Sequence, residues 1–141
     1  EYFKFSFVRD PYARIVSGWH DKIVNRGPGG GNLKPDEREK LLNFGDFVHW
    51  VSQQDPVSIN KHYRPQSLLV PKDVDVIGRL ESFNDDILQI TERIGLKTPE
   101  IVPHHNRYEI PPPMSIWNRR LLDIVSNYYW ADFDRFGYEF K

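Results

Sequence analysis

The sequence predicts an α/β protein. Two short apolar runs, at residues 3–8 and 75–80, have the length and composition of buried strands. Each run is followed by a segment whose apolar residues recur at helical spacing, behind a residue that can cap a helix. The 141 residues are enough for one domain with a single hydrophobic core.

The first strand leads directly into a helix. The run stops at Arg9-Asp10-Pro11, where Asp10 can cap a helix whose first residue is Pro11, a position at which the missing N–H costs nothing. Apolar residues at i, i+4, i+7 and i+11 predict the buried stripe of this helix: Tyr12, Val16, Trp19 and Ile23. Three polar residues fall on a different face: Arg14, Ser17 and Asp21.

This strand–helix junction suggests an anion site. In open α/β sheets, ligands bind beyond the carboxyl ends of the strands, which is where Arg9 lies. Ser17 is about 9 Å along the helix axis from Pro11, too far for the helix terminus alone to serve the same ligand. An arginine side chain that leans along the helix could hold one phosphate together with Ser17. The ordinary alternative is that Arg9 pairs with a carboxylate and Ser17 is solvated.

The rest of the chain predicts further helices joined by loops. The expected helices are a short one at 36–42, one capped by Asp46, one that begins at Ser82 and ends at Gly95, and a last one capped by Ser115. Residues 58–71 are irregular and rich in hydrogen-bonding groups. The aromatic residues at 128–140 are expected to close the core rather than to stack on bases.

Two loops carry features that resemble binding motifs. The glycines at 25–35 are not followed by Lys and Ser/Thr at the start of a helix, so we interpret them as a mobile surface loop rather than a phosphate cradle, with a lid over an acceptor pocket as the alternative. His104 and His105 lie in the proline-bearing loop at 96–113, and no carboxylate or third histidine has suitable spacing. We therefore predict no metal site.

Composition excludes several classes of function. The chain has 19 Lys and Arg against 20 Asp and Glu, and this balance argues against broad nucleic-acid binding. It has no cysteine, hence no disulfide or thiolate metal site. No apolar run reaches the 18 residues of a transmembrane helix.

The segment RDPYARIVSGW, at 9–19, resembles the 3′-phosphate-binding segment of PAPS-dependent sulfotransferases, in which an Arg and a Ser eight residues later grip the nucleotide. Three further stretches resemble the carbohydrate-type (Golgi-type) branch in the same order: HYRPQSLLV at 62–70, DVIGRLESFNDDI at 75–87 and YYWADFDRFGY at 128–138. The resemblance spans nearly the whole chain, and the first segment is the most specific.

This resemblance implies a three-layer, P-loop-NTPase-like fold with a parallel sheet. It implies transfer of a sulfuryl group from PAPS to an acceptor hydroxyl on a carbohydrate, with PAP as product and with no metal. Arg9 and Ser17 match the 3′-phosphate contacts, and Arg107 is a further candidate. His62 and Arg64 could contact the acceptor or the transferred group. His62 is also the candidate for the general base, although related enzymes commonly carry the base ahead of this region.

One expected part of the family pattern is missing from these residues. No strand followed by Lys or Arg, Gly and Ser/Thr occurs at 1–141 to cradle the 5′-phosphosulfate, so we expect a single sulfotransferase-like domain, 1–141, that is an incomplete portion of the fold. Two alternatives stay open. One is a non-catalytic nucleotide-binding or interaction fragment, and the other is a P-loop kinase-like phosphotransferase, which would need a Walker loop and a Mg²⁺ carboxylate.

Expectations about partners and compartment follow from the same features. An exposed sheet edge left by a missing strand would favour self-association. Many Golgi carbohydrate sulfotransferases carry cysteines near the stretch that matches 68–72. Their absence slightly favours a bacterial, cytoplasmic protein over one of the Golgi lumen.

Overall fold

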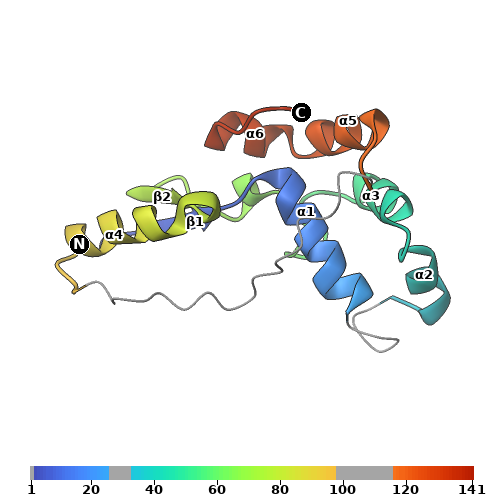
Figure 1. The fold of residues 1–141 in the computed structure, drawn as a ribbon, viewed down its shortest axis with the longest axis horizontal. Coiled ribbons are helices and arrows are strands. Elements are labelled where there is room, and N and C mark those ends of the chain that lie inside the picture. Colours follow the sequence, from blue (N-terminus) through green and yellow to red (C-terminus); the bar gives the residue numbers. More distant parts are fainter. Residues whose placement is uncertain (1, 26–32, 98–115) are drawn as a thin grey trace.

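The computed structural model describes residues 2–25, 33–97 and 116–141 (Figure 1). The helices and strands of these residues are, in chain order, β1 (Phe5–Val8), α1 (Pro11–Trp19), the π-helical turn η1 (His20–Val24), α2 (Pro35–Lys40), α3 (Phe44–Ser52), the short 3-10 turn η3 (Gln66–Leu68), β2 (Val76–Arg79), the 3-10 turn η4 (Leu80–Ser82), α4 (Phe83–Arg93), α5 (Arg119–Tyr128) and α6 (Trp130–Phe136). Most of the glycine loop at 25–35 and most of the proline-bearing loop at 96–113 lie outside the described residues.

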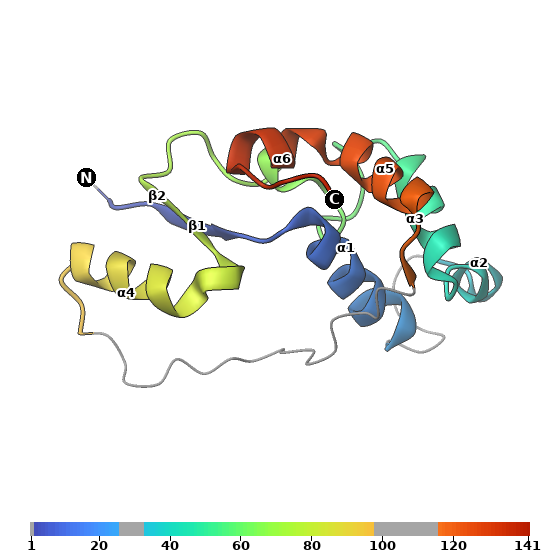
Figure 2. The same cartoon turned by 45° about the horizontal axis from the view of Figure 1, so that its top comes forward.

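β1 and β2 form a small parallel sheet, which confirms the α/β class. Phe5 pairs with Val76 and Val8 with Arg79 at the two ends of the register. Helices α4 and α6 lie on opposite sides of this sheet (Figure 2). Because side chains alternate along a strand, Phe7 faces Phe83 of α4 at 4.8 Å between ring centroids, whereas Val8 is in the apolar cluster with Phe136 of α6.

The prediction of two buried strands is wrong in part. Val8 and Gly78 are buried, but Phe5 is 46% exposed and Ile77 is 39% exposed. Their exposure follows from the arrangement, since a two-stranded sheet covered by single helices leaves the ends of its strands in contact with solvent.

α1 forms as its sequence predicts. The Asp10 side chain accepts a hydrogen bond from the Ala13 N–H at 2.9 Å, and Pro11 occupies the first helical position. Tyr12, Val16 and Ile23 of the predicted stripe are buried. Trp19 is half-buried, and its indole N–H donates to the Leu41 carbonyl at 2.9 Å.

The main hydrophobic core lies between α1, α3, α5 and α6. Its central members are buried apolar residues of these helices and of the junction between α5 and α6: Tyr12, Ile15, Phe47, Val51, Leu121, Val125, Tyr129 and Phe133.

Two predicted capping residues need correction. Asn43 caps α3 by accepting from the Asp46 N–H, so Asp46 lies in the first turn, and Asn118 caps α5. Ser115 lies outside the described residues.

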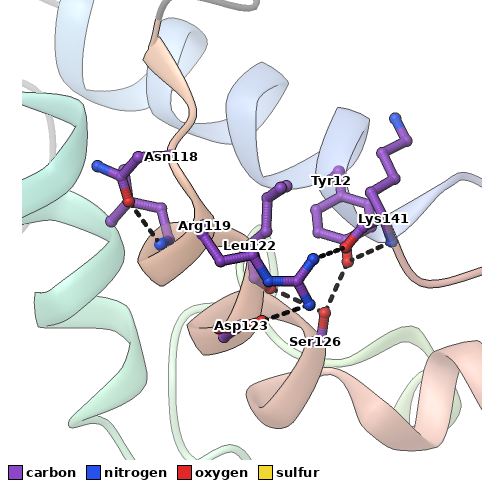
Figure 3. A network of polar contacts seen from close by, with 8 residues as sticks. Tyr12, Asn118, Arg119, Leu122, Asp123, Ser126 and Lys141 are labelled. Carbon is purple, nitrogen blue, oxygen red and sulfur yellow. Dashed lines mark hydrogen bonds and ion pairs between the residues drawn. The ribbon is translucent and has the colours of Figure 1, made fainter.

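Polar contacts attach the end of the chain to this core (Figure 3). The Tyr12 hydroxyl lies 2.6 Å from Ser126 Oγ and accepts from the Lys141 N–H at 3.2 Å. Ser126 donates its own proton to the Leu122 carbonyl, so Tyr12 is the donor between the two hydroxyls. Arg119 pairs with Asp123 and also donates to the Lys141 carbonyl. These bonds fix α5 and the last residue against the first turn of α1.

Candidate functional site

A cavity of about 510 Å³ opens beyond the carboxyl ends of β1 and β2. Its lining comes from the end of each strand, the polar face of α1 and the segment around η3: Phe7, Arg9, Arg14, Ser17, Gly18, Asp21, Lys61, His62, Gln66, Leu69 and Leu80. Arg9, Ser17 and His62, which the sequence singles out from two separate segments, therefore face one space. Arg14 and Asp21, predicted to share a face of α1 with Ser17, line it as well.

Arg9 is presented by the corner between β1 and α1. Its backbone N–H donates to Gln66 Oε1 at 2.9 Å, and its carbonyl accepts from Gln66 Nε2 at 2.8 Å. The guanidinium makes no hydrogen bond or ion pair with residues 2–25, 33–97 or 116–141. Pairing with a carboxylate, the ordinary alternative, is thus not seen within these ranges.

Ser17 lies two turns into α1. Its residue is half-buried, and across the described parts of the chain its hydroxyl has no hydrogen-bond partner. A serine inside a helix often bonds the carbonyl one turn earlier. Since Ser17 does not, its hydroxyl is free to donate to a ligand in the cavity.

The segment that carries His62 is attached to α1 by Arg14. The Arg14 guanidinium donates to the Arg64 carbonyl at 2.7 Å and to the Lys61 carbonyl at 3.1 Å. Burial lowers the pKa of Arg14 from its usual value, although Tyr129 and Asp132 act in the opposite direction. His62 is itself exposed, at the edge of the cavity.

Gly18 allows this segment to approach the helix. A Cβ at position 18 would lie 3.2 Å from the Tyr63 ring and 3.5 Å from the His62 carbonyl oxygen. The small residue therefore favours close contact between α1 and residues 62–63, and both His62 and Ser17 line the cavity beside this contact.

Among the described residues, Arg64 is a sequence candidate that does not line the cavity. The Arg64 guanidinium donates to the Ile59 carbonyl at 3.0 Å and does not line the cavity, so the structure does not bring it to the site as predicted. Glu81, just after β2, accepts from the Asp10 N–H at 2.6 Å and from the Tyr138 hydroxyl at 2.9 Å, so it connects the β1–α1 corner to the end of the chain. Arg107 lies outside the described residues, as do the adjacent histidines at 104 and 105.

The structure adds residues that sequence reasoning did not single out. Lys61 contributes a cation, Gln66 holds Arg9, and Leu69 and Leu80 form an apolar side of the cavity together with Phe7. The sequence carries no signal for Gln66, because its role follows from burial in the folded chain, where it is only 6% exposed. Buried amides are there to make hydrogen bonds.

The electrostatics of the cavity favour an anion. Arg9, Arg14 and Lys61 border it, against the single carboxylate of Asp21. Lys22 already pairs with that carboxylate at 2.5 Å. A phosphate or sulfate that enters would meet an excess of positive charge and a free serine hydroxyl. Nowhere in the described ranges do three His, Asp or Glu side chains gather in a group that could hold a metal ion.

A cavity at the carboxyl end of a parallel strand, with an arginine at the corner and a serine on the following helix, is the arrangement expected of an anion site in an α/β protein. Comparison with known proteins is more specific, because residues 1–139 match the Sulfotransferase family. The chain belongs to this family, and membership implies a sulfonate donor such as PAPS.

Several animal proteins are similar to the chain. Carbohydrate sulfotransferase 14 of Danio rerio is 28% identical over 145 residues, which cover 91% of this chain and 37% of the relative. Carbohydrate sulfotransferase 14 of Mus musculus is 29% identical, and the match covers 97% of this chain and 42% of the relative. Carbohydrate sulfotransferase 10 of Homo sapiens is 27% identical and covers 98% and 47%. The chain thus spans less than half the length of these relatives.

These comparisons correct the expectation about compartment. The slight preference for a bacterial, cytoplasmic protein is wrong, since the relatives are carbohydrate sulfotransferases of animals. The lack of cysteine carried no information, because a fold that needs no disulfide is compatible with any redox environment. Within the described part of the chain, every helix is too short or too polar to cross a membrane. No solved structure matches the chain.

Proposed function

We propose that this protein transfers a sulfuryl group from PAPS to a hydroxyl of a carbohydrate acceptor. The observation that carries the proposal is the pair formed by Arg9 and Ser17, which line one cationic cavity and whose side chains have no hydrogen-bond or ion-pair partner among the described residues. Family membership and relatives named as carbohydrate sulfotransferases support the donor and the acceptor class.

In this proposal Arg9 and Ser17 hold the 3′-phosphate of PAPS and of the product PAP. A guanidinium can donate two parallel hydrogen bonds to a phosphate, and a serine hydroxyl adds a third. Arg107 is a further proposed contact from the segment outside the described residues. The apolar side formed by Phe7, Leu69 and Leu80 suits the flat face of a purine or sugar ring.

The transfer forms a bond between the acceptor oxygen and sulfur and breaks the bond from sulfur to the phosphate oxygen. A base must accept the hydroxyl proton, and cations must stabilise the charge on the departing phosphate. His62 is the candidate base in the described part of the chain, because it is exposed and borders the same cavity as Arg9.

We further propose that residues 1–141 form one sulfotransferase-like domain with a three-layer, P-loop-like arrangement. The parallel pair β1–β2 with α4 and α6 on opposite sides supports it. The sequence at 1–141 contains no loop of the kind that cradles a 5′-phosphosulfate, so binding of the 3′-phosphate is the part of the function that these residues carry.

The test is calorimetric titration of the full-length protein with PAP. We expect Arg9→Ala to raise the dissociation constant about 100-fold, because charge-assisted hydrogen bonds contribute about 1.5–3 kcal/mol. Arg9→Lys should lose less, since it keeps the charge without the planar fork. Arg93→Ala, an exposed arginine on α4, is the matched control.

The same titrations separate the competing functions. Unchanged affinity of Arg9→Ala for PAP would refute the assignment of the site. Arg9-dependent binding of PAP without any transfer to a panel of sugars would favour a nucleotide-binding protein that lacks the chemistry.

A further inference from the structure

The Gln66 side chain forms a two-bond clamp on the backbone of Arg9. Its amide oxygen accepts from the Arg9 N–H at 2.9 Å, and its amide nitrogen donates to the Arg9 carbonyl at 2.8 Å. A carboxamide used in this way mimics a neighbouring strand, because it offers one acceptor and one donor in the same plane. The clamp therefore acts at the residue where β1 ends and the anion site begins.

Gln66 is itself fixed by a buried carboxylate on α6. Asp132 has no exposed surface, and its two oxygens accept from the Gln66 N–H at 2.8 Å and from the Ser67 N–H at 2.7 Å. Hydrogen bonds to a charged acceptor are the stronger kind, and they are stronger still away from water. The start of η3 is thereby held on α6, and the Gln66 side chain is held on the Arg9 backbone.

The clamp matters for binding because of where the Arg9 side chain begins. The guanidinium is at the end of a long, flexible side chain with no partner of its own in the described structure, so its position depends on the backbone that carries it. Functional side chains need support that holds them to about 0.5 Å. At this corner Gln66 provides that support on both sides of the Arg9 Cα.

We propose that Gln66 is a positioning residue for the 3′-phosphate site and acts on the nucleotide through Arg9. This inference rests on the proposed function, because it takes PAPS and PAP as the ligands. It predicts a specific signature. Loss of the clamp should weaken recognition of the 3′-phosphate and leave the remainder of the nucleotide unaffected.

The test compares two ligands on the same protein sample. Gln66→Met keeps the length of the side chain and removes both hydrogen bonds. In the full-length protein we expect it to raise the dissociation constant of PAP about tenfold and that of adenosine 5′-phosphosulfate, which lacks the 3′-phosphate, less than twofold. Gln53→Met, at an exposed position just after α3, is the matched control and should change neither.

A double-substitution cycle distinguishes positioning from direct contact. Where Arg9 is already alanine, Gln66→Met should cause no further loss of PAP affinity, because the clamp then has no guanidinium to place. A further loss in that background, or equal losses for both ligands, would overturn the inference and make Gln66 a direct ligand or a general structural residue.

The remaining outcomes also decide the question. If Gln66→Met does not fold, Gln66→Glu takes its place, because it keeps the shape and the acceptor for the Arg9 N–H but lacks the donor. In Gln66→Glu the affinity for PAP should then fall relative to the affinity for adenosine 5′-phosphosulfate. An unchanged ratio overturns the inference. If the unchanged protein binds PAP through Arg9 and Gln66→Met binds PAP with the same affinity, only this inference fails. If the unchanged protein does not bind PAP, the proposed function fails as well.

Discussion

Ser17 and Arg9 differ in what each can contribute to an anion. The hydroxyl of Ser17 offers one hydrogen bond without charge, whereas the guanidinium of Arg9 offers a charged fork. Both side chains lack partners in the described residues, so within these ranges neither has to give up a bond to another residue when a ligand binds. We therefore expect their contributions to PAP binding to be unequal.

Ser17→Ala should raise the dissociation constant for PAP about tenfold, which corresponds to about 1.4 kcal/mol and is less than the effect of Arg9→Ala. Titration calorimetry on the full-length protein measures it. Ser52→Ala is a suitable control, since that hydroxyl donates to the His49 carbonyl within α3 and does not border the cavity. Equal losses for Ser17→Ala and Ser52→Ala would argue against a ligand contact by Ser17.

At the level of single residues, the sequence predicted what depends on local spacing. Ser17 shares a face of α1 with Arg14 because of helical periodicity, and Arg9 lies at the corner just before this helix. Gln66 could not be assigned in the same way, because its partner is 57 residues away and the pairing depends on the whole fold. Arg64 donates instead to a nearby carbonyl, that of Ile59, and does not line the cavity.

The strands show how one element shapes the cavity wall. Gly78 of β2 is paired in register with Phe7 of β1, and a Cβ at position 78 would be 2.6 Å from the Phe7 ring. The absence of a side chain lets the ring cover the neighbouring strand and still contact Phe83 of α4. Since Phe7 also lines the cavity, Gly78 fixes part of the wall.

Gly78→Val should lower the free energy of unfolding by about 1–2 kcal/mol, because the Phe7 ring must leave its place over β2. Valine favours strands more than glycine does, so intrinsic propensity would act in the opposite direction. Urea unfolding measures the change, with Ile77→Val on the exposed neighbouring position as the control. A variant as stable as the unchanged protein would show that the ring has room to move.

At the level of elements, the periodicity of apolar residues predicted where a helix lies but not the residue at which it begins. The helix expected behind Asp46 is present as α3, but its cap is Asn43, whose side chain accepts from the Asp46 N–H. Asn and Asp are both good caps, and three residues separate the capping residue from the N–H it bonds. Either residue could therefore have been chosen from the sequence. Packing decided the matter, since Phe44 is buried and must belong to the helix.

Across the whole molecule, polar side chains connect the sheet region to the helical core. Arg135 of α6 donates to the carbonyls of Ser67, Val70 and Pro71, and Arg79 at the end of β2 donates to the Phe136 carbonyl at 2.7 Å. Parallel pairing of β1 with β2 could be expected from the family resemblance. The long-range hydrogen bonds of Arg135 and Arg79 could not be expected from the sequence, because they depend on which loops α6 approaches.

Tyr129 is a buried tyrosine of the hydrophobic core and gives the fold a predictable response to alkali. It is 2% exposed, and its hydroxyl donates to the Tyr63 carbonyl at 2.6 Å. Burial raises the pKa of Tyr129 above its usual value; Tyr128, Asp132 and Tyr63 act in the same direction, and Arg14 opposes them. The folded protein therefore keeps a proton that the unfolded chain loses near pH 10.

The free energy of unfolding should therefore decrease in alkali. Stability from this group is fully present below about pH 10 and is lost as the pH rises above it, by about 1.4 kcal/mol per pH unit for one proton. Tyr129→Phe should be less stable near neutral pH by about 1 kcal/mol, since the hydrogen bond to Tyr63 is absent. Its free energy of unfolding should fall less steeply between pH 10 and 11.5. Urea unfolding over this range measures both slopes, with Tyr2→Phe, at a 92% exposed position, as the control. Parallel slopes for all three proteins would mean that Tyr129 ionises in the folded state as readily as in the unfolded one, and would contradict its role as a buried, neutral member of the core.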